Sequence, residues 1–320
     1  MYDPNVPTPI QAYYIPAAKP KRYLKFCFGG CTPRAFKWIV GFLAVIIAIA
    51  IIAPIVVKFG FRRGCLIQQD PESIDSHPLT MQWDQATYPN LEFSLGDLGD
   101  NFKGYITNAS GNTAMVKIYR SSDVVDVSVE QNGNIYRIKG SHGRLGCMRT
   151  KLRIYLPLGF QNVDVKGDVG SWEVSNVNIT GRMSLKTNVG EINFSNVQAQ
   201  SISGLSDLGE IKGDVAVSQG ENIISTNTGK IEMTWKYPAD AQVSISGSTK
   251  TGQGYFELPS HFRGSIDIET KPFLGRAIIN DANVFYSTNT DSRKVGQRGG
   301  QGPQSCRLTS QMGNVELKFV

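Results

Sequence analysis

The chain has 320 residues, of which 41% are hydrophobic and 19% charged, with 33 glycines and 15 prolines. Glycine without a triplet period excludes a collagen-like helix, and the valine and isoleucine content excludes global disorder. The length allows two average domains or one long all-β domain.

The net charge of +6 is concentrated at the N-terminus. Residues 1–37 contain six lysines and arginines against one acidic residue, residues 38–57 contain no charge, and residues 58–320 contain 27 basic and 26 acidic residues. Binding to a phosphate backbone needs lysines and arginines clustered on a broad surface. We therefore expect no nucleic-acid partner.

Residues 38–57 form an uncharged apolar run, WIVGFLAVIIAIAIIAPIVV. A helix of this length, at ~1.5 Å per residue, spans the ~30 Å hydrocarbon core of a bilayer. A signal peptide has a shorter apolar core, and a buried helix of a soluble domain is rarely apolar all round. We predict a transmembrane helix over 38–57, with the lipid bilayer as a partner.

The flanking charges predict the orientation. Six basic residues precede the run, whereas Lys58, Arg62 and Arg63 follow it. The cytoplasmic side of a membrane protein carries the excess of basic residues. We expect a single-pass type II protein at the cell surface, with a disordered basic cytoplasmic tail over 1–37 and a stalk over 58–85.

Potential modification sites agree with this orientation. The sequons occur only after the apolar run, so the candidate N-glycosylation sites are Asn108, Asn178 and Asn193. Each asparagine could equally remain unmodified.

The five cysteines divide in the same way. Cys27 and Cys31 lie just before the apolar run, where S-acylation is common, although two inert thiols are an equal alternative. Cys147 and Cys306 could form a disulfide in an oxidising lumen. Cys65 is then left over, and could link two chains as a homodimer.

Short runs of alternating apolar and polar residues begin at about residue 90, which is typical of half-buried strands. Polar turns ending in glycine then recur at Gly170, Gly190, Gly209, Gly229 and Gly252, with spacings of 20, 19, 20 and 23 residues. The next such glycine, Gly313, lies 61 residues further on, which is close to three more periods.

A period near 20 residues indicates coils that cannot bury their apolar side alone and therefore stack on one another. We predict that residues 86–320 form an all-β, single-stranded stacked β-solenoid, in addition to the one transmembrane α-helix. A β-sandwich with coincidentally spaced turn glycines is the alternative.

The run Leu152-Arg-Ile-Tyr-Leu-Pro-Leu-Gly159, followed by repeated Gly-x-Ile/Val units, resembles the "putative adhesin" family of β-solenoid domains. The resemblance covers roughly residues 90–320 and is clearest over 152–258. It implies a β-solenoid fold and an adhesive role, and carries over no catalytic residue.

Residues 287–305 depart from this pattern, because they are polar and glycine-rich. We predict a flexible loop inserted between the last coils. Its basic residues Arg293, Lys294 and Arg298 could alternatively contact acidic glycans.

No common catalytic motif is present: the sequence has no G-x-S-x-G, H-E-x-x-H, G-x-x-x-x-G-K-[ST] or G-x-G-x-x-G. The tripeptides 289–291 and 137–139 are similar to polygalacturonase motifs, but they occur in reversed order and no Asp-Asp pair accompanies them. Asp168, Glu191 and Glu210 recur beside the repeat glycines and could bind Ca²⁺, but Lys230 interrupts the row. We therefore expect no catalytic residue, cofactor or metal.

These features favour a membrane-anchored, non-catalytic surface protein that binds glycans or other proteins. The alternatives are an enzyme that modifies cell-wall polysaccharides on a β-helix scaffold, and a structural or sensory stalk that dimerises through Cys65.

Overall fold

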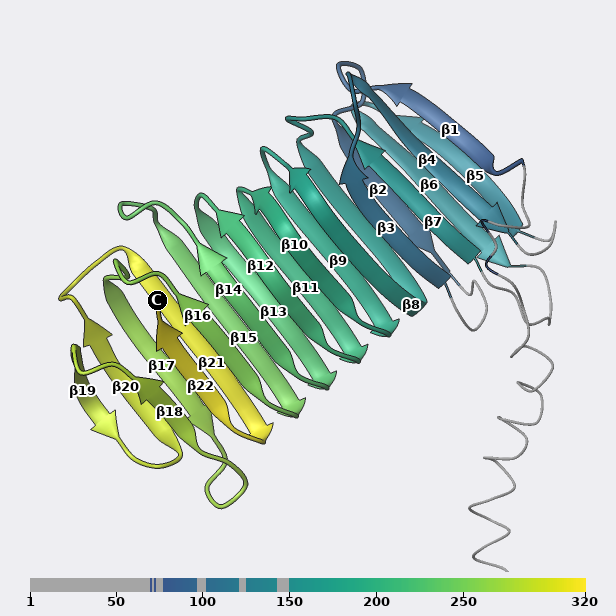
Figure 1. Ribbon diagram of the computed structural model, residues 1–320. Coiled ribbons are helices and arrows are strands. Elements are labelled where there is room, and N and C mark those ends of the chain that lie inside the picture. Colours follow the sequence, from purple (N-terminus) through teal and green to yellow (C-terminus); the bar gives the residue numbers. More distant parts are fainter. Residues whose placement is uncertain (1–69, 71, 73–76, 97–101, 121–124, 143–149) are drawn as a thin grey trace, which may run out of the picture. The chain divides into compact units, whose positions relative to one another are not determined.

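The computed structural model (Figure 1) describes residues 70, 72, 77–96, 102–120, 125–142 and 150–320, which belong to a unit extending from Gly64 to Val320. Every named element is a strand, β1 to β22, which confirms the prediction of an all-β fold. Among these residues no helix is long and apolar enough to cross a membrane. The predicted tail over 1–37 and transmembrane helix over 38–57 lie outside the described residues.

Strands in the central part of the unit alternate between two parallel sheets. Sheet A contains the second half of β8 and then, in chain order, β10 (Ile192–Ala199), β12 (Ile211–Val217), β14 (Ile231–Lys236), β16 (Gly254–Leu258) and β22 (Val315–Phe319). Sheet B contains the first half of β8 (Asn162–Asn178) and then β9 (Arg182–Val189), β11 (Ser201–Leu208), β13 (Gly220–Thr228), β15 (Val243–Thr251), β17 (Gly264–Thr270) and β21 (Gln304–Met312).

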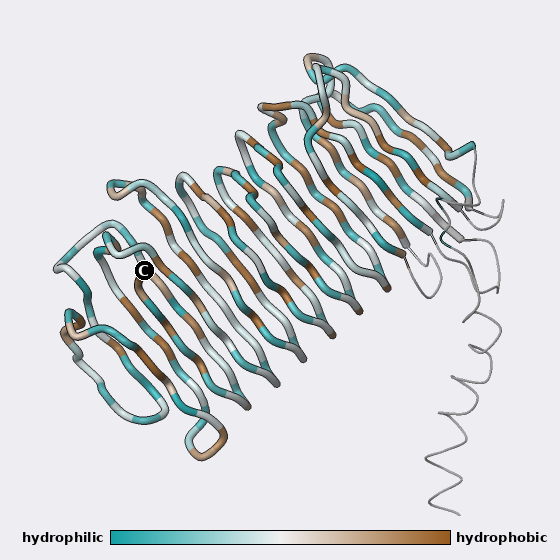
Figure 2. Tube along the Cα trace, in the orientation of Figure 1, coloured by the Kyte–Doolittle hydropathy of each residue, from teal (hydrophilic) through white to brown (hydrophobic). Residues whose placement is uncertain are grey.

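Apolar residues one period apart lie side by side in this arrangement. Ile192 is opposite Trp172 on one side and Ile211 on the other, and Ile211 is in turn opposite Ile231. All four side chains are buried. Strand alternation directs every second residue inward, and Figure 2 shows apolar and polar positions alternating along the strands. Each coil therefore completes the core of its neighbours.

The repeat glycines occupy one corner of the stack and lie directly above one another. A Cβ atom on Gly209 would lie 1.9 Å from the carbonyl oxygen of Gly190, and one on Gly229 would lie 1.9 Å from that of Gly209. Both glycines have φ values, 152° and 153°, that side chains disfavour. Close approach of two backbones and the positive φ together explain why this corner needs glycine.

A buried hydroxyl lies three residues before the corner glycines at 190, 209, 229, 252 and 313 and completes each of these corners. Ser206 Oγ donates to the Gly190 carbonyl at 3.0 Å, and Thr226 Oγ1 donates to the Gly209 carbonyl at 3.0 Å. The same bond is made by further hydroxyls along the stack, from Thr187, Thr249 and Ser310. The hydroxyl satisfies a carbonyl that is turned toward the interior, where an unpaired acceptor is costly.

Replacing Thr226 by valine is expected to destabilise the domain by about 1–3 kcal/mol, because the side chain keeps its shape but the Gly209 carbonyl loses its hydroxyl donor. Urea unfolding of the full chain, followed by circular dichroism, measures the effect. Thr107→Val is the matched control, because Thr107 lies half-buried on the outward face of β3 (Phe102–Asn108). Equal stabilities of the two variants would contradict the role given to Thr226.

At its C-terminal end the stack does not follow the order of the chain. Strand β21 pairs with β15 on one side and β17 on the other, and β22 likewise lies between β16 and β18 (Ala277–Asn280). Gly252 N–H accordingly donates to Met312 O at 2.8 Å. The expectation of about three further periods between Gly252 and Gly313 is therefore wrong: these two glycines belong to adjacent coils.

The N-terminal end is built in the same way. The coil of β2 (Asn90–Leu95) and β3 lies between β8 and the coil of β6 (Ile135–His142) and β7 (Thr150–Leu156). Antiparallel strands complete this end, with β5 (Val125–Asn132) on β6, β4 (Thr113–Arg120) on β7 and β1 (Leu79–Asp84) on β4. Strand β1 corrects the predicted stalk over 58–85, because its residues Met81 and Trp83 alternate inward and are buried in the core.

The segment predicted as an inserted loop, 287–305, is also corrected. It contains the end of β19 (Val284–Asn289), the whole of β20 (Arg293–Arg298) and the start of β21. Strand β20 pairs antiparallel with β17, and β19 pairs antiparallel with β20. The polar composition of this hairpin reflects its place at the edge of sheet B, where most side chains face solvent.

Candidate functional site

The residues between β17 and β21, 271–303, form an insertion in the repeat that contains β18, β19 and β20. Two hollows border it, one on the outward face of sheet B and one at the corner beside the loop between β17 and β18. They lie where the regular outward surface of the stacked coils is interrupted, and the insertion supplies part of the wall of each.

The site on sheet B, which we call the hydroxyl groove, has a volume of about 740 Å³. Its floor consists of outward-facing residues of sheet B, and its far wall of residues from β19 and β20. The residues that line it include Ser244, Ser246, Ser265, Asp267, Phe285, Tyr286, Gln297, Ser305 and Arg307.

A row of hydroxyls crosses the groove because the strand registers place them opposite one another. Ser305 on β21 is paired with Ser244 of β15 and with Ser265 of β17, and the row continues to Gln297 and Phe285. Ser305 Oγ and Ser244 Oγ are 3.0 Å apart. Neighbouring strands are ~4.8 Å apart, so the row offers hydrogen-bonding groups at a regular interval.

Aromatic side chains stand at the end of this row. Phe285 is 78% exposed, which is unusual for phenylalanine, whereas its neighbour Tyr286 is half-buried. Burial raises the pKa of the Tyr286 hydroxyl above its ordinary value, so it stays protonated at neutral pH. Lys294 Nζ lies 5.5 Å from the centre of the Tyr286 ring. The groove thus combines one exposed apolar ring with many neutral hydrogen-bonding groups.

The basic residues of the hairpin are engaged within the protein. Arg293 pairs with Asp267 at 3.3 Å, Lys294 donates to the Asn289 side chain, and Arg298 pairs with Asp281 and donates to the Phe262 carbonyl at 3.0 Å. Arg298 is also close to buried, with a 12% exposed side chain. Arg293 and Arg298 are therefore not supported as a contact for acidic glycans, since carboxylates already compensate their charges, whereas Lys294 meets the neutral Asn289 side chain and the Tyr286 ring.

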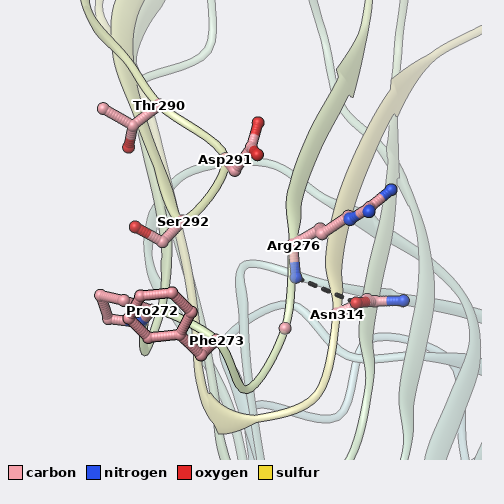
Figure 3. A pocket seen from close by; sticks show the side chains of 8 residues that line it. Pro272, Phe273, Arg276, Thr290, Asp291, Ser292 and Asn314 are labelled. Carbon is pink, nitrogen blue, oxygen red and sulfur yellow. Dashed lines mark hydrogen bonds between the residues drawn. The ribbon is translucent and has the colours of Figure 1, made fainter.

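The second hollow, the corner pocket, also has a volume of about 740 Å³ (Figure 3). Pro272 and Phe273 stand on one side, with Thr290, Asp291 and Ser292 above them and Arg276 and Asn314 opposite. The Arg276 N–H donates to Asn314 Oδ1 at 2.9 Å, which joins the insertion to the last coil. Phe273 is fully exposed and has a φ of 66°, an uncommon value for a phenylalanine.

The predicted modification sites are scattered over the surface. Asn178 is exposed at the end of β8, Asn193 is half-exposed on the outward face of β10, and Asn108 is half-buried at the end of β3. N-glycosylation at these positions remains a prediction. Glu191 and Glu210 are solvent-facing corner residues, and no group of metal-ligating side chains is found in the part of the chain that the structure describes.

Cys306 points into the core. It is a free thiol with 2% exposure, and β-sheet register places it between Ile245 and Ile266. Burial raises its pKa, which makes it an unreactive core residue. Its predicted partner Cys147, together with Cys27, Cys31 and Cys65, lies outside the described residues.

Comparisons with known proteins found structural neighbours only. No protein-family model matches the chain, and no curated protein matches it. A "putative cell adhesion protein" from Clostridium sporogenes is 12% identical, with a TM-score of 0.30 over 76% of this chain and 100% of that one. A "putative adhesin" from Bacteroides fragilis is 14% identical, with a TM-score of 0.38 over 76% and 98%. A "putative lipid binding protein" from Parabacteroides distasonis is 13% identical, with a TM-score of 0.25 over 77% and 98%.

Proposed function

We propose that the protein is an adhesin-like surface protein whose hydroxyl groove binds neutral glycans without cleaving them. One observation carries this proposal: the exposed ring of Phe285 ends a row of hydroxyl and amide groups on the outward face of sheet B. A sugar ring has an apolar face that packs on an aromatic ring and hydroxyls that exchange hydrogen bonds with polar side chains.

The charges in the groove favour a neutral ligand. Asp267 is compensated by Arg293 at 3.3 Å, and Arg307 lies opposite Asp267 in the register of β17 and β21. A carboxylate or phosphate polymer would find no large excess of positive charge here. Glycosidic hydrolysis would need two facing carboxyl groups, one of them able to donate a proton. Asp267 is engaged in an ion pair with Arg293 on β20, which supports binding rather than hydrolysis.

The experiment is a binding assay of the full-length protein on a panel of immobilised neutral cell-wall polysaccharides. Phe285→Ala is expected to weaken binding about fivefold or more, because an aromatic platform contributes ~1 kcal/mol or more per stacked ring. Phe273→Ala is the matched control, since Phe273 is also an exposed phenylalanine of the insertion but lies in the corner pocket.

Neither substitution removes a buried side chain, so both variants should keep the wild-type thermal midpoint. Failure of the wild type to bind any polysaccharide of the panel, or equal losses in the two variants, would contradict the proposed role of the groove. Release of reducing ends during the assay would instead indicate an enzyme.

We further propose the setting in which this groove works. The helix expected over 38–57 would anchor the chain with its N-terminus in the cytoplasm, and the stacked strands would form a β-solenoid displayed at the cell surface. The parallel pairing with a period of about 20 residues supports the β-solenoid assignment. Cys65 remains a candidate for a disulfide between two copies, and protein ligands remain the alternative to glycans.

A further inference from the structure

A second cluster of functional groups lies on the outward face of sheet A, far along the stack from the hydroxyl groove. It consists of Lys103, Tyr105, Lys117, Lys151 and Arg153, and we call it the basic–aromatic cluster. Strand β7 is paired with β3 and β4, so the register brings Tyr105 and Lys117 to either side of Arg153. Lys103 lies opposite Lys151 in the same way.

The ring of Tyr105 is surrounded by cations. Lys103 Nζ, Arg153 Cζ and Lys151 Nζ lie 5.0, 5.2 and 5.6 Å from its centre. The negative face of the ring reduces repulsion among them and orients them together. Among the described residues of these strands, Glu173 supplies a counter-charge, 4.0 Å from Lys103. Four cations therefore share one carboxylate, which leaves an excess of positive charge on this face.

Two acidic side chains from the segment before β1 occupy the cluster. Asp70 Oδ2 lies 3.0 Å from Lys151 Nζ, and Glu72 Oε2 lies 2.7 Å from an Arg153 nitrogen and also contacts Lys151. The hydrogen bond from Arg153 lowers the pKa of Glu72, so the carboxylate stays charged at neutral pH. The Lys151 side chain is only 12% exposed under these contacts.

We propose that the basic–aromatic cluster is a recognition site for an acidic peptide of a partner protein with the pattern Asp-x-Glu, and that Asp70 and Glu72 occupy it in the free chain. The occupant seen in the structure is a peptide of this pattern, which shows the spacing of carboxylates that the site accepts. In addition, the Nε atom of Arg153 is buried and has no hydrogen-bond partner, so the site holds a donor that Glu72 leaves unused.

The proposal predicts competition between the internal segment and a peptide added in solution. Asp70 and Glu72 are tethered to the cluster by the chain, which gives them an effective concentration of roughly millimolar. For an added peptide of ~0.1 mM affinity, removing the charges of Asp70 and Glu72 should therefore strengthen peptide binding about tenfold. The probe is a fluorescent peptide with the sequence of residues 67–75, IQQDPESID. Its binding to the full-length protein in detergent is followed by fluorescence anisotropy.

Three variants make the test specific. Asp70→Asn with Glu72→Gln should bind the peptide about tenfold more tightly than the wild type. Adding Arg153→Gln to that background should weaken binding about tenfold or more, because a charge-assisted hydrogen bond is lost. Arg182→Gln is the matched control, since Arg182 is exposed on β9 in sheet B. Should Arg153→Gln fail to fold, Lys103→Ala replaces it, because that side chain is 57% exposed.

The proposal is overturned if the Asp70→Asn, Glu72→Gln protein does not bind the peptide, or if Arg153→Gln and Arg182→Gln have equal effects. It is also overturned if inorganic phosphate or a uronic-acid oligomer displaces the peptide at lower concentration than unlabelled peptide does, because the site would then prefer another class of anion. A peptide with Asn and Gln in place of its two acids should not bind. None of these outcomes depends on the hydroxyl groove.

Discussion

Gly209→Ala should destabilise the domain by more than about 4 kcal/mol, because a single methyl group would be forced into a backbone atom and into a strained conformation. The added Cβ would lie 1.9 Å from the Gly190 carbonyl oxygen, at a φ of 152°. That oxygen cannot move away easily, since it accepts a hydrogen bond from Ser206. Urea unfolding of the full chain, followed by circular dichroism, measures the loss.

Gly133→Ala is the matched control for this prediction. Gly133 also has a positive φ, 58°, but no atom lies within 4 Å of the position of its Cβ. This variant should therefore lose only the ~1 to 2 kcal/mol of a left-handed conformation. A Gly209 variant as stable as the Gly133 variant would show that the corner can open, and that stacking does not require the regular spacing of the glycines along this chain.

Ending the chain after Pro303 is expected to release the preceding residues, 264–303, from the folded structure. Strand β21 is the parallel neighbour of β17, and β22 is the parallel neighbour of β18. Removing β21 and β22 therefore separates the coil of β17 and β18 from the stack. What remains for β17 is the antiparallel strand β20. Amide hydrogen exchange in β17 should approach that of an unfolded segment, while β9 to β14 stay protected.

Limited trypsin digestion provides an independent measurement of this effect. The truncated protein should be cut after Arg293 and Lys294, which the full-length protein protects by the pairing of β20 with β17 and, for Arg293, by its ion pair with Asp267. If coils were stacked in chain order, the truncation would remove only the outermost coil and 264–303 would remain protected. Retained protection of β17 would thus contradict the observed strand order.

The chain pattern was sufficient to predict the central strands, because apolar and polar residues alternate along most of their length and each corner carries its own glycine. A further signal was available: the corner glycines at 190, 209, 229, 252 and 313 are each preceded by Ser or Thr at the third position before them. These hydroxyls proved to be the buried donors of the corners. Such features can be predicted from the sequence because every coil makes the same contacts with its neighbours.

The candidate sites could not be predicted in the same way. In β19 the residues Val284, Phe285 and Tyr286 are all apolar or aromatic, so alternation does not say which of them faces out. Val284 turned out to be buried and Phe285 exposed. Likewise, the positive charges around Tyr105 come from β3 and β7, which are more than forty residues apart in sequence. Only the register in which these two strands pair brings the charges together.

The sequence by itself determined the all-β class, the period of the central coils and the requirement for glycine at their corners, because these depend on contacts that every coil makes in the same way. Only the tertiary structure decided that the first and last coils enter the stack out of order and that the insertion folds into a hairpin. The physical reason is that β15, β17 and β21 present equivalent alternating edges, so the choice of neighbour depends on how their side chains pack across the whole core.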